Sequence, residues 1–300
     1  MSPLARVTIL HCLPAVACLL LVEFTPGCSR SSKEDDGTAN AQQFTGRRLE
    51  LFVGSASQPP TEDAARLFEE RTGADIEVHF GGSGAMLSQM KLAGRGDIYF
   101  PGSSDYMELA KREGDVDPET ETRVAHLIPA INVPAGNPRG IRSLADLAGS
   151  GVRVGIARPD SVCVGLYAAE VLERTGLGER VRTNVVTHAE SCAKTAQLVA
   201  TGQVDAVLGW RVFHYWNPER IETVLLSPDQ VPRIGYLPAA VSRYSRDREL
   251  ALAFLEFLTS PDGQAIYRRW HYLTTVEEAR SFARPDTPVG GEWTLPESWR

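Results

Sequence analysis

The sequence predicts an α/β fold with mostly parallel strands, divided between two lobes. Short stretches with strand-like alternation are separated by longer stretches with helical periodicity, which is the pattern of βαβ units. A cluster of turn-forming residues at 134–138 separates a first series of these units from a second. The chain has 300 residues, 43% hydrophobic and 23% charged, which is enough apolar material for one large core or two smaller ones.

The first series contains three strands, each followed by a helix. Gly73 follows the first helical stretch and is a typical stop signal, and Gly81 and Gly82 link the second strand to a helix that begins near Ser83. We expect strands at 49–53, 76–80 and 97–100, and helices at 61–72, 85–92 and 105–113.

The second series predicts another α/β lobe. Its expected strands lie at 127–133, 153–157, 183–187 and 206–210, and its helices at 164–175 and 191–201. A strand at 234–241 and helices at 248–258 and 264–270 follow. The simplest arrangement has two crossings between the lobes, near residues 130 and 235. Lobe I then comprises 48–130 and 236–300, and lobe II comprises 131–235.

The N-terminus has the features of an export signal. One positive charge in residues 1–6 precedes a mostly apolar run at 7–22, which is too short and too interrupted for a bilayer span. Residues 25–28 (TPGC) resemble a bacterial lipoprotein signal, which implies removal of 1–27 and a lipid anchor on Cys28. Ordinary secretion and a buried N-terminal helix are the alternatives. Residues 28–47 lack apolar periodicity, as a flexible tether would.

The charge balance argues against nucleic acid as a partner. The chain has 38 acidic residues and 31 Lys and Arg, which gives a net charge of −7. This balance provides no basic surface of the kind that binds the phosphates of a nucleic acid. Removing residues 1–27 takes away one Arg and one Glu, so the mature charge is unchanged.

Four segments, at 51–90, 96–116, 136–172 and 254–274, together resemble the periplasmic molybdate/tungstate-binding proteins of ABC importers. The resemblance implies a type II periplasmic-binding-protein fold, with two lobes joined by a two-strand hinge and a tetrahedral oxyanion enclosed between them. It also implies a monomer outside the cytoplasm that has no cofactor, catalyses no reaction and delivers its ligand to a permease and ATPase.

The same resemblance carries a set of ligand-binding positions onto this sequence. In the first lobe these are Ser55 or Ser57, Ser83 and Gly84; in the second they are Ser161, Val164, Ser191, Cys192 and Trp210. A serine at a helix start after glycines suits an acceptor-only anion, because hydroxyl and backbone N–H groups both donate there. Ordinary helix capping explains the same serines without a ligand.

Cys163 and Cys192 precede two helices of the second lobe, and three states remain open for them. A disulfide is the default for such a pair in an oxidising compartment. A soft metal ion bound by both cysteines with His188 is the second state, and a pair of free buried thiols is the third.

Two rival functions follow from other features. The Gly81–Ala85 turn is similar to the nucleophile elbow of a serine hydrolase with Ser83 as the nucleophile, although Ala85 stands where the elbow has glycine. A same-fold receptor for a metal ion or another small solute is the nearer rival. The cations Arg153, Arg158, Lys194 and Arg211 lie near the predicted site and are expected to be surface or ion-paired groups unless one of them contacts the ligand.

Overall fold

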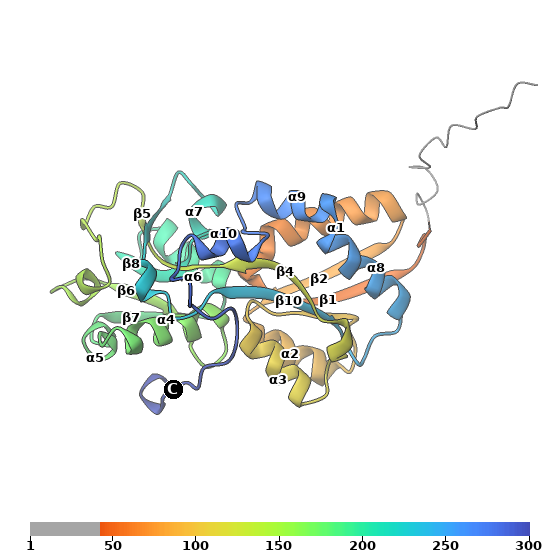
Figure 1. Ribbon diagram of the computed structural model, residues 1–300, viewed down its shortest axis with the longest axis horizontal. Helices are drawn as coiled ribbons and strands as arrows, with labels where there is room; N and C mark the ends of the chain where they lie inside the picture. The colour runs from red at the N-terminus through yellow and green to blue at the C-terminus, as the bar shows by residue number, and fades with distance from the viewer. Residues whose placement is uncertain (1–42) are drawn as a thin grey trace, which may run out of the picture. The chain divides into compact units, whose positions relative to one another are not determined.

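The computed structural model of the protein describes residues 43–300, which form two five-stranded mixed sheets with helices packed around each (Figure 1). The predicted signal peptide, the Cys28 anchor and most of the tether lie outside the described residues. Residues 43–47, assigned to the tether, belong to the folded lobe instead, because Phe44 is buried and pairs with Thr72 through its backbone N–H. Within residues 43–300, no helix combines the length and apolar character that a membrane span needs.

The first sheet has the order β2-β1-β3-β10-β4, and β10 runs opposite to the other four strands. Its strands are β1 (Arg48–Gly54), β2 (Asp75–Gly81), β3 (Ile98–Phe100), β4 (Thr122–Leu127) and β10 (Gly235–Val241). The helices of this lobe are α1 (Gln58–Thr72), α2 (Ser83–Ala93), α3 (Ser104–Arg112), α8 (Arg248–Thr259) and α9 (Pro261–Arg269).

The second sheet repeats this plan with the order β7-β6-β8-β5-β9, and β5 is the reversed strand. Its strands are β5 (Pro129–Pro134), β6 (Val154–Ala157), β7 (Val185–Ala189), β8 (Ala206–Trp210) and β9 (Ile221–Leu225). Helices α4 (Cys163–Arg174), α5 (Gly178–Arg182), α6 (Cys192–Ala200) and α7 (Phe213–Trp216) belong to it, and α10 (Val276–Arg280) follows near the C-terminus.

The chain passes from the first sheet to the second between β4 and β5, and returns between β9 and β10. The predicted strand at 127–133 is therefore two strands in different sheets, separated at Ile128, and β9 was not predicted. The strand expected at 183–187 begins two residues later. Asn184 is held in the preceding turn, where its side-chain amide donates to the carbonyls of Leu147 and Gly149.

Helix α1 begins three residues earlier than the sequence predicts, at Gln58, and Pro59 and Pro60 occupy its first turn. Proline suits this position because the first N–H groups of a helix have no partner within it and the ring sets a helical φ. At the other end Gly73 adopts φ 72° and caps the helix, as predicted from the glycine.

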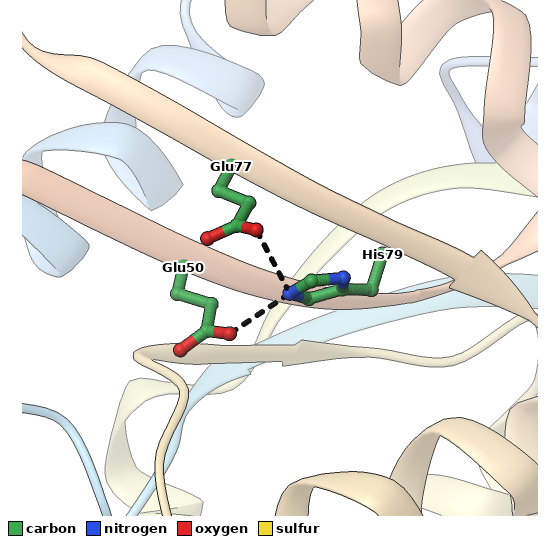
Figure 2. Close-up of side chains that lie close together, drawn as sticks. All are labelled: Glu50, Glu77 and His79. Carbon is green, nitrogen blue, oxygen red and sulfur yellow. Dashed lines mark hydrogen bonds and ion pairs between the residues drawn. The ribbon is translucent and has the colours of Figure 1, made fainter.

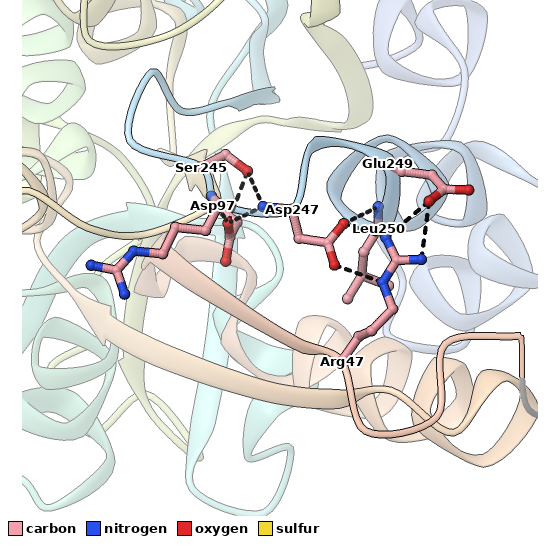
Figure 3. A network of polar contacts seen from close by, with 7 residues as sticks. Arg47, Asp97, Ser245, Asp247, Glu249 and Leu250 are labelled. Carbon is pink, nitrogen blue, oxygen red and sulfur yellow. Dashed lines mark hydrogen bonds and ion pairs between the residues drawn. The ribbon is translucent and has the colours of Figure 1, made fainter.

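A polar network fastens the returning chain to the start of the first sheet (Figure 3). The Asp97 carboxylate accepts the Glu50 N–H on one side and the Ser245 hydroxyl and Arg246 N–H on the other. Asp247 caps α8 by accepting the Leu250 N–H at 3.1 Å and pairs with Arg47, whose Nε lies 2.7 Å away. Residues 200 positions apart in the chain therefore hold β1 and α8 together.

The C-terminal segment packs against the second lobe, although the sequence assigned all of 236–300 to the first. Ala279, Ala283 and Trp299 belong to the apolar core formed by the second sheet and its helices. The Trp299 indole N–H donates to Glu173 on α4 at 2.6 Å. The segment also contacts the first lobe, where the Trp293 N–H donates to Asp105 on α3 at 3.0 Å, so it touches both lobes.

Candidate functional site

Five loops meet where the carboxyl ends of the parallel strands of both sheets face each other. They follow β1, β2 and β3 in the first lobe and β6 and β7 in the second. Four of them lead directly into an α-helix, and the loop after β1 reaches α1 through a short 3₁₀ turn. Two hydrogen bonds cross between the lobes here: the Gly84 N–H donates to the Ser161 carbonyl at 3.0 Å, and the Ala193 N–H donates to Ser55 Oγ at 3.2 Å. Such strand ends are where open α/β sheets place ligands.

Glycines allow the loops to approach this closely. A Cβ on Gly82 would lie 2.7 Å from the Glu190 carbonyl oxygen of the opposite lobe, and one on Gly102 would lie 2.5 Å from Cys163 Sγ. Neither position has room for a side chain, so the glycine turns predicted after β2, and the similar turn after β3, are required for the lobes to meet as they do.

Four serines of these loops are buried, and the hydroxyl oxygen of each accepts a hydrogen bond from another group of the protein. Ser83 Oγ accepts the Gly102 N–H at 3.0 Å, and Ser191 Oγ accepts the Lys194 N–H at 3.1 Å as the N-cap of α6. Ser57 Oγ accepts the Thr61 hydroxyl, and Ser55 Oγ accepts the cross-lobe N–H of Ala193. Each of these hydroxyls keeps its own hydrogen, so each is able to donate to an anion.

One serine of the site was missed by the sequence analysis. Ser103, in the loop between β3 and α3, is fully buried, and its hydroxyl has no hydrogen-bond partner within residues 43–300. The sequence contains the pattern that could have identified it. Glycine and then serine stand between a strand and a helix at Gly102-Ser103-Ser104, as they do at Gly82-Ser83.

Gly84 and Ser161 lie at the contact between the lobes and are bonded to each other through backbone groups. The Ser161 hydroxyl donates to Asp160 at 3.0 Å. In this structure both residues therefore join the lobes, as Ser55 also does, and the hydroxyl hydrogen of Ser161 is used by Asp160.

Cys163 and Cys192 occupy the first positions of α4 and α6, and the predicted disulfide is not formed in this structure. Both thiols are free and about 1% exposed, with the sulfur atoms 3.5 Å apart. Burial and the contact with Cys163 raise the pKa of the Cys192 thiol well above its usual range, while the Val164 N–H and the Trp210 indole N–H act to lower it.

Trp210 ends β8 and is completely buried. Its ring packs edge-on against Tyr167, with centroids 4.9 Å apart. The indole N–H has no oxygen or nitrogen partner within the described residues and lies near the Cys192 sulfur. It is therefore a buried donor at the same place as the thiols.

His188 does not join the cysteines. It lies in a separate pocket of about 340 Å³ with Arg158, Asp160 and Arg300. Burial, with a smaller effect of Arg158, lowers the pKa of His188. The metal site predicted as an alternative, with both cysteines and His188, is thus not assembled in the described part of the chain.

The four cations near the site are engaged elsewhere. Arg153 pairs with Asp205, Arg158 with Asp160, and Lys194 with Glu190. Arg211 donates to the His271 carbonyl, and burial lowers its pKa. The expectation of ion-paired groups is confirmed for the first three. The polar groups that the five loops bring together are therefore N–H and O–H dipoles rather than these cations.

A groove of about 600 Å³ opens beside the site, between α1 of the first lobe and α6 and α7 of the second. Gln58 and Ala193, which line it, directly follow Ser57 and Cys192 in the chain. The groove therefore lies next in the chain to a buried serine and a buried thiol, although neither lines it.

A second polar cluster lies on the first sheet, where Glu50, Glu77 and His79 approach one another (Figure 2). The His79 Nε2 atom is 2.8 Å from Glu50 and 3.7 Å from Glu77. Arg95 and Arg48 already pair with the two carboxylates. These ion pairs account for the cluster without a metal ion.

Comparison with known proteins identifies the family. A sequence profile described as bacterial extracellular solute-binding protein matches residues 49–273. The chain belongs to this family. It is a solute-binding protein of the ABC-transporter type rather than an enzyme, so the resemblance read from the sequence is confirmed and the hydrolase alternative is not supported.

Individual relatives are similar over most of this solute-binding protein. A putative binding protein of Haemophilus influenzae is 28% identical over 72% of this chain and 86% of its own. A putative ABC transporter substrate-binding lipoprotein of Bacillus subtilis, YvgL, is 21% identical over 86% and 96%. The molybdate-binding protein ModA of Rhodobacter capsulatus is 24% identical over 72% and 84%.

Among solved structures, the periplasmic molybdate-binding protein of Azotobacter vinelandii has the same fold. It superposes with a TM-score of 0.67 at 19% identity, over 76% of this chain and 99% of its own. The predicted α/β fold class with two lobes is thereby confirmed.

Proposed function

We propose that this solute-binding protein captures a small oxyanion of the molybdate or tungstate type between its lobes and delivers it to an ABC permease. The observation that carries the proposal is the meeting of α2, α3, α4 and α6 at one buried place, with serines at or just before their first turns. Helix N-termini and hydroxyls supply donors and partial positive charge, which an acceptor-only dianion needs.

Closure of the lobes supplies the binding mechanism. The first lobe offers Ser55, Ser83 and Ser103, and the second lobe offers Ser191 and the first-turn N–H groups of α4 and α6. The Gly84–Ser161 and Ala193–Ser55 hydrogen bonds join the two sets. Selectivity follows from the number of donors, because an anion that is too small leaves buried N–H groups unpaired at about 1–3 kcal/mol each.

We infer that the protein acts as a monomer, exported and anchored by lipid at Cys28. The apolar run at 7–22, followed by a small residue and cysteine, supports the anchor, and the Bacillus subtilis relative is described as a lipoprotein. Metabolic labelling with a radioactive fatty acid tests the anchor, and a Cys28→Ser variant that still incorporates the label would refute it.

The ligand class is tested by thermal unfolding in the presence of molybdate, tungstate, sulfate and phosphate. A ligand present at 100 times its dissociation constant stabilises the folded state by ~2.7 kcal/mol. Stabilisation by molybdate or tungstate supports the proposal, whereas no shift with any of the four anions rejects it.

Ser83→Ala tests the placement of the site. Removing one hydroxyl that donates to a charged ligand costs about 1.5–3 kcal/mol, so we expect the affinity for the anion to fall ~10- to 150-fold. Ser88→Ala, on an exposed position of the same helix, is the matched control and leaves affinity unchanged. Equal affinities of the two variants, measured by calorimetric titration, would remove Ser83 from the site.

A further inference from the structure

The oxyanion site contains two thiols that its proposed function does not use. Cys163 Sγ faces the first lobe, since a Cβ on Gly102 would lie 2.5 Å from it, and Cys192 Sγ lies beside the Trp210 indole N–H. The sulfur atoms are free, fully buried and 3.5 Å apart. Two sulfurs so placed form a bidentate ligand for one thiophilic atom.

The separation of the sulfurs restricts which atom they bind together. Two bonds of about 2.3 Å to one centre span ~3.5 Å when they meet at about 100°, and ~4.6 Å when they are collinear. The observed 3.5 Å therefore fits an angular centre and disfavours a linear two-coordinate soft cation such as Cu(I).

The groups around the thiols restrict further which metal or metalloid the pair can bind. A tetrahedral zinc ion needs four ligands, usually all from the protein. Within residues 43–300 no carboxylate or imidazole forms a group of three ligands with the two sulfurs. A pyramidal trivalent centre needs only one further ligand, which its own hydroxyl group supplies.

Burial also favours a neutral ligand over a cation. Both thiols are about 1% exposed, so a metal cation would bring its charge into an apolar setting and have to displace the thiol protons there. A neutral hydroxide of arsenic or antimony carries hydroxide groups of its own, and these take up the thiol protons. The Trp210 indole N–H, which has no oxygen or nitrogen partner among the described residues, is placed to donate to the remaining hydroxyl.

We propose that the reduced Cys163–Cys192 pair binds trivalent arsenic or antimony, presented as the neutral trihydroxide, through both sulfur atoms. Two As–O bonds and two S–H bonds break, two As–S bonds form, and each thiol proton leaves with a hydroxide as water. Arsenic stays trivalent, so no oxidant or reductant takes part. The disulfide predicted from the sequence uses the same sulfurs and excludes this ligand, so the inference concerns the reduced pair.

Sodium arsenite added to the reduced, purified chain tests the proposal, with Cys12, Cys18 and Cys28 replaced by serine so that only the buried pair of thiols remains. We expect native mass spectrometry to show one arsenic atom per chain and thiol titration to show the loss of two reactive thiols. Cys163→Ser and Cys192→Ser each leave a single As–S bond in place of a chelate, which lowers the affinity ~10²- to 10⁴-fold. Ser88→Ala, at an exposed position of α2, is the control that keeps both sulfurs and retains arsenite binding.

A second measurement covers the case in which a cysteine variant fails to fold. A small vicinal dithiol removes arsenic from the wild-type protein, while a monothiol at the same thiol concentration does not. The proposal is overturned if the reduced protein takes up no arsenic, or if either serine variant binds it as tightly as wild type. Arsenite binding without molybdate or tungstate binding rejects only the proposed oxyanion function, and the opposite result rejects only the dithiol.

Discussion

At the scale of single residues, two aspartates of the first lobe are explained by the backbone groups that they satisfy. Asp97 and Asp247 both accept N–H groups at the start of structural elements. Asp247 also pairs with Arg47, and the hydrogen bond from Arg47 is the main cause that lowers the pKa of Asp247. The negative charge of Asp247, in addition to its role as the N-cap of α8, therefore contributes to the stability of the folded state.

Asp247→Asn separates these two contributions, because asparagine is also a good N-cap. We expect a loss of about 0.5–1 kcal/mol in the free energy of unfolding at pH 7, the usual value of a partly exposed ion pair. The folded pKa of Asp247 lies below its unfolded value of about 3.9, so the difference is fully present above that pH. It disappears as the pH falls through the folded pKa.

Urea unfolding of wild type and variant between pH 7 and pH 2.5 measures this difference. Asp229→Asn, at an exposed aspartate with no ion pair in the described residues, is the control. A difference between wild type and the Asp247 variant that stays constant across the pH range would contradict the assignment.

At the scale of elements, helix starts and glycine contacts position the site. Helix α4 lies close against β6 because Gly165 has no side chain, and a Cβ there would come within 2.4 Å of the Ala157 carbonyl oxygen. The atoms nearest to this Cβ belong to the backbone, so no side-chain rotation can relieve the contact. Cys163 is two residues away, so the packing of Gly165 also sets the position of the thiol.

Gly165→Ala is expected to destabilise the protein even though alanine favours helix formation by about 1 kcal/mol. The clash moves α4 away from β6, and overpacking of this kind costs about 1–3 kcal/mol. Thermal unfolding checks the loss, and anion titration checks whether the site moves with the helix. Gly235→Ala, whose nearest neighbour lies at 3.3 Å, should cost less; an equal or smaller loss for Gly165→Ala would contradict the packing argument.

At the scale of the whole described chain, a buried ion network joins the two lobes. Arg233 precedes β10 and donates to Asp105 on α3 at 2.9 Å and to Glu170 on α4 at 2.6 Å. Its guanidinium also lies 4.0 Å from the centre of the Tyr167 ring. All three charged groups are at least nine-tenths buried, so the network depends on every member.

Arg233→Met is expected to cost about 3–5 kcal/mol, because it leaves two buried carboxylates without their shared partner. Adding Asp105→Asn and Glu170→Gln should recover part of this loss by removing the buried charges. Arg248→Met removes an exposed ion pair with Asp117 and should cost less than about 1 kcal/mol. Urea unfolding compares the variants, and similar losses at Arg233 and Arg248 would show that the network is not stabilising.

Much of the site was predictable because it depends on local signals. A strand, a glycine turn, a serine and a helix follow one another at Ser83, and parallel strands place such turns at one edge of a sheet. The same signal at Ser103 was overlooked. Arg233 could not be predicted, since nothing in the residues around it indicates two carboxylates from helices more than 60 positions away.

The sequence by itself determined the alternation of strands and helices, the family and the loops where glycines and serines lead into helices, because these depend on short-range periodicity and on turn chemistry. Only the tertiary structure decided the break between β4 and β5, the packing of the C-terminal segment on both lobes and the state of the cysteines. The separation of two sulfurs 29 positions apart depends on how two helices pack, and no local pattern encodes that distance.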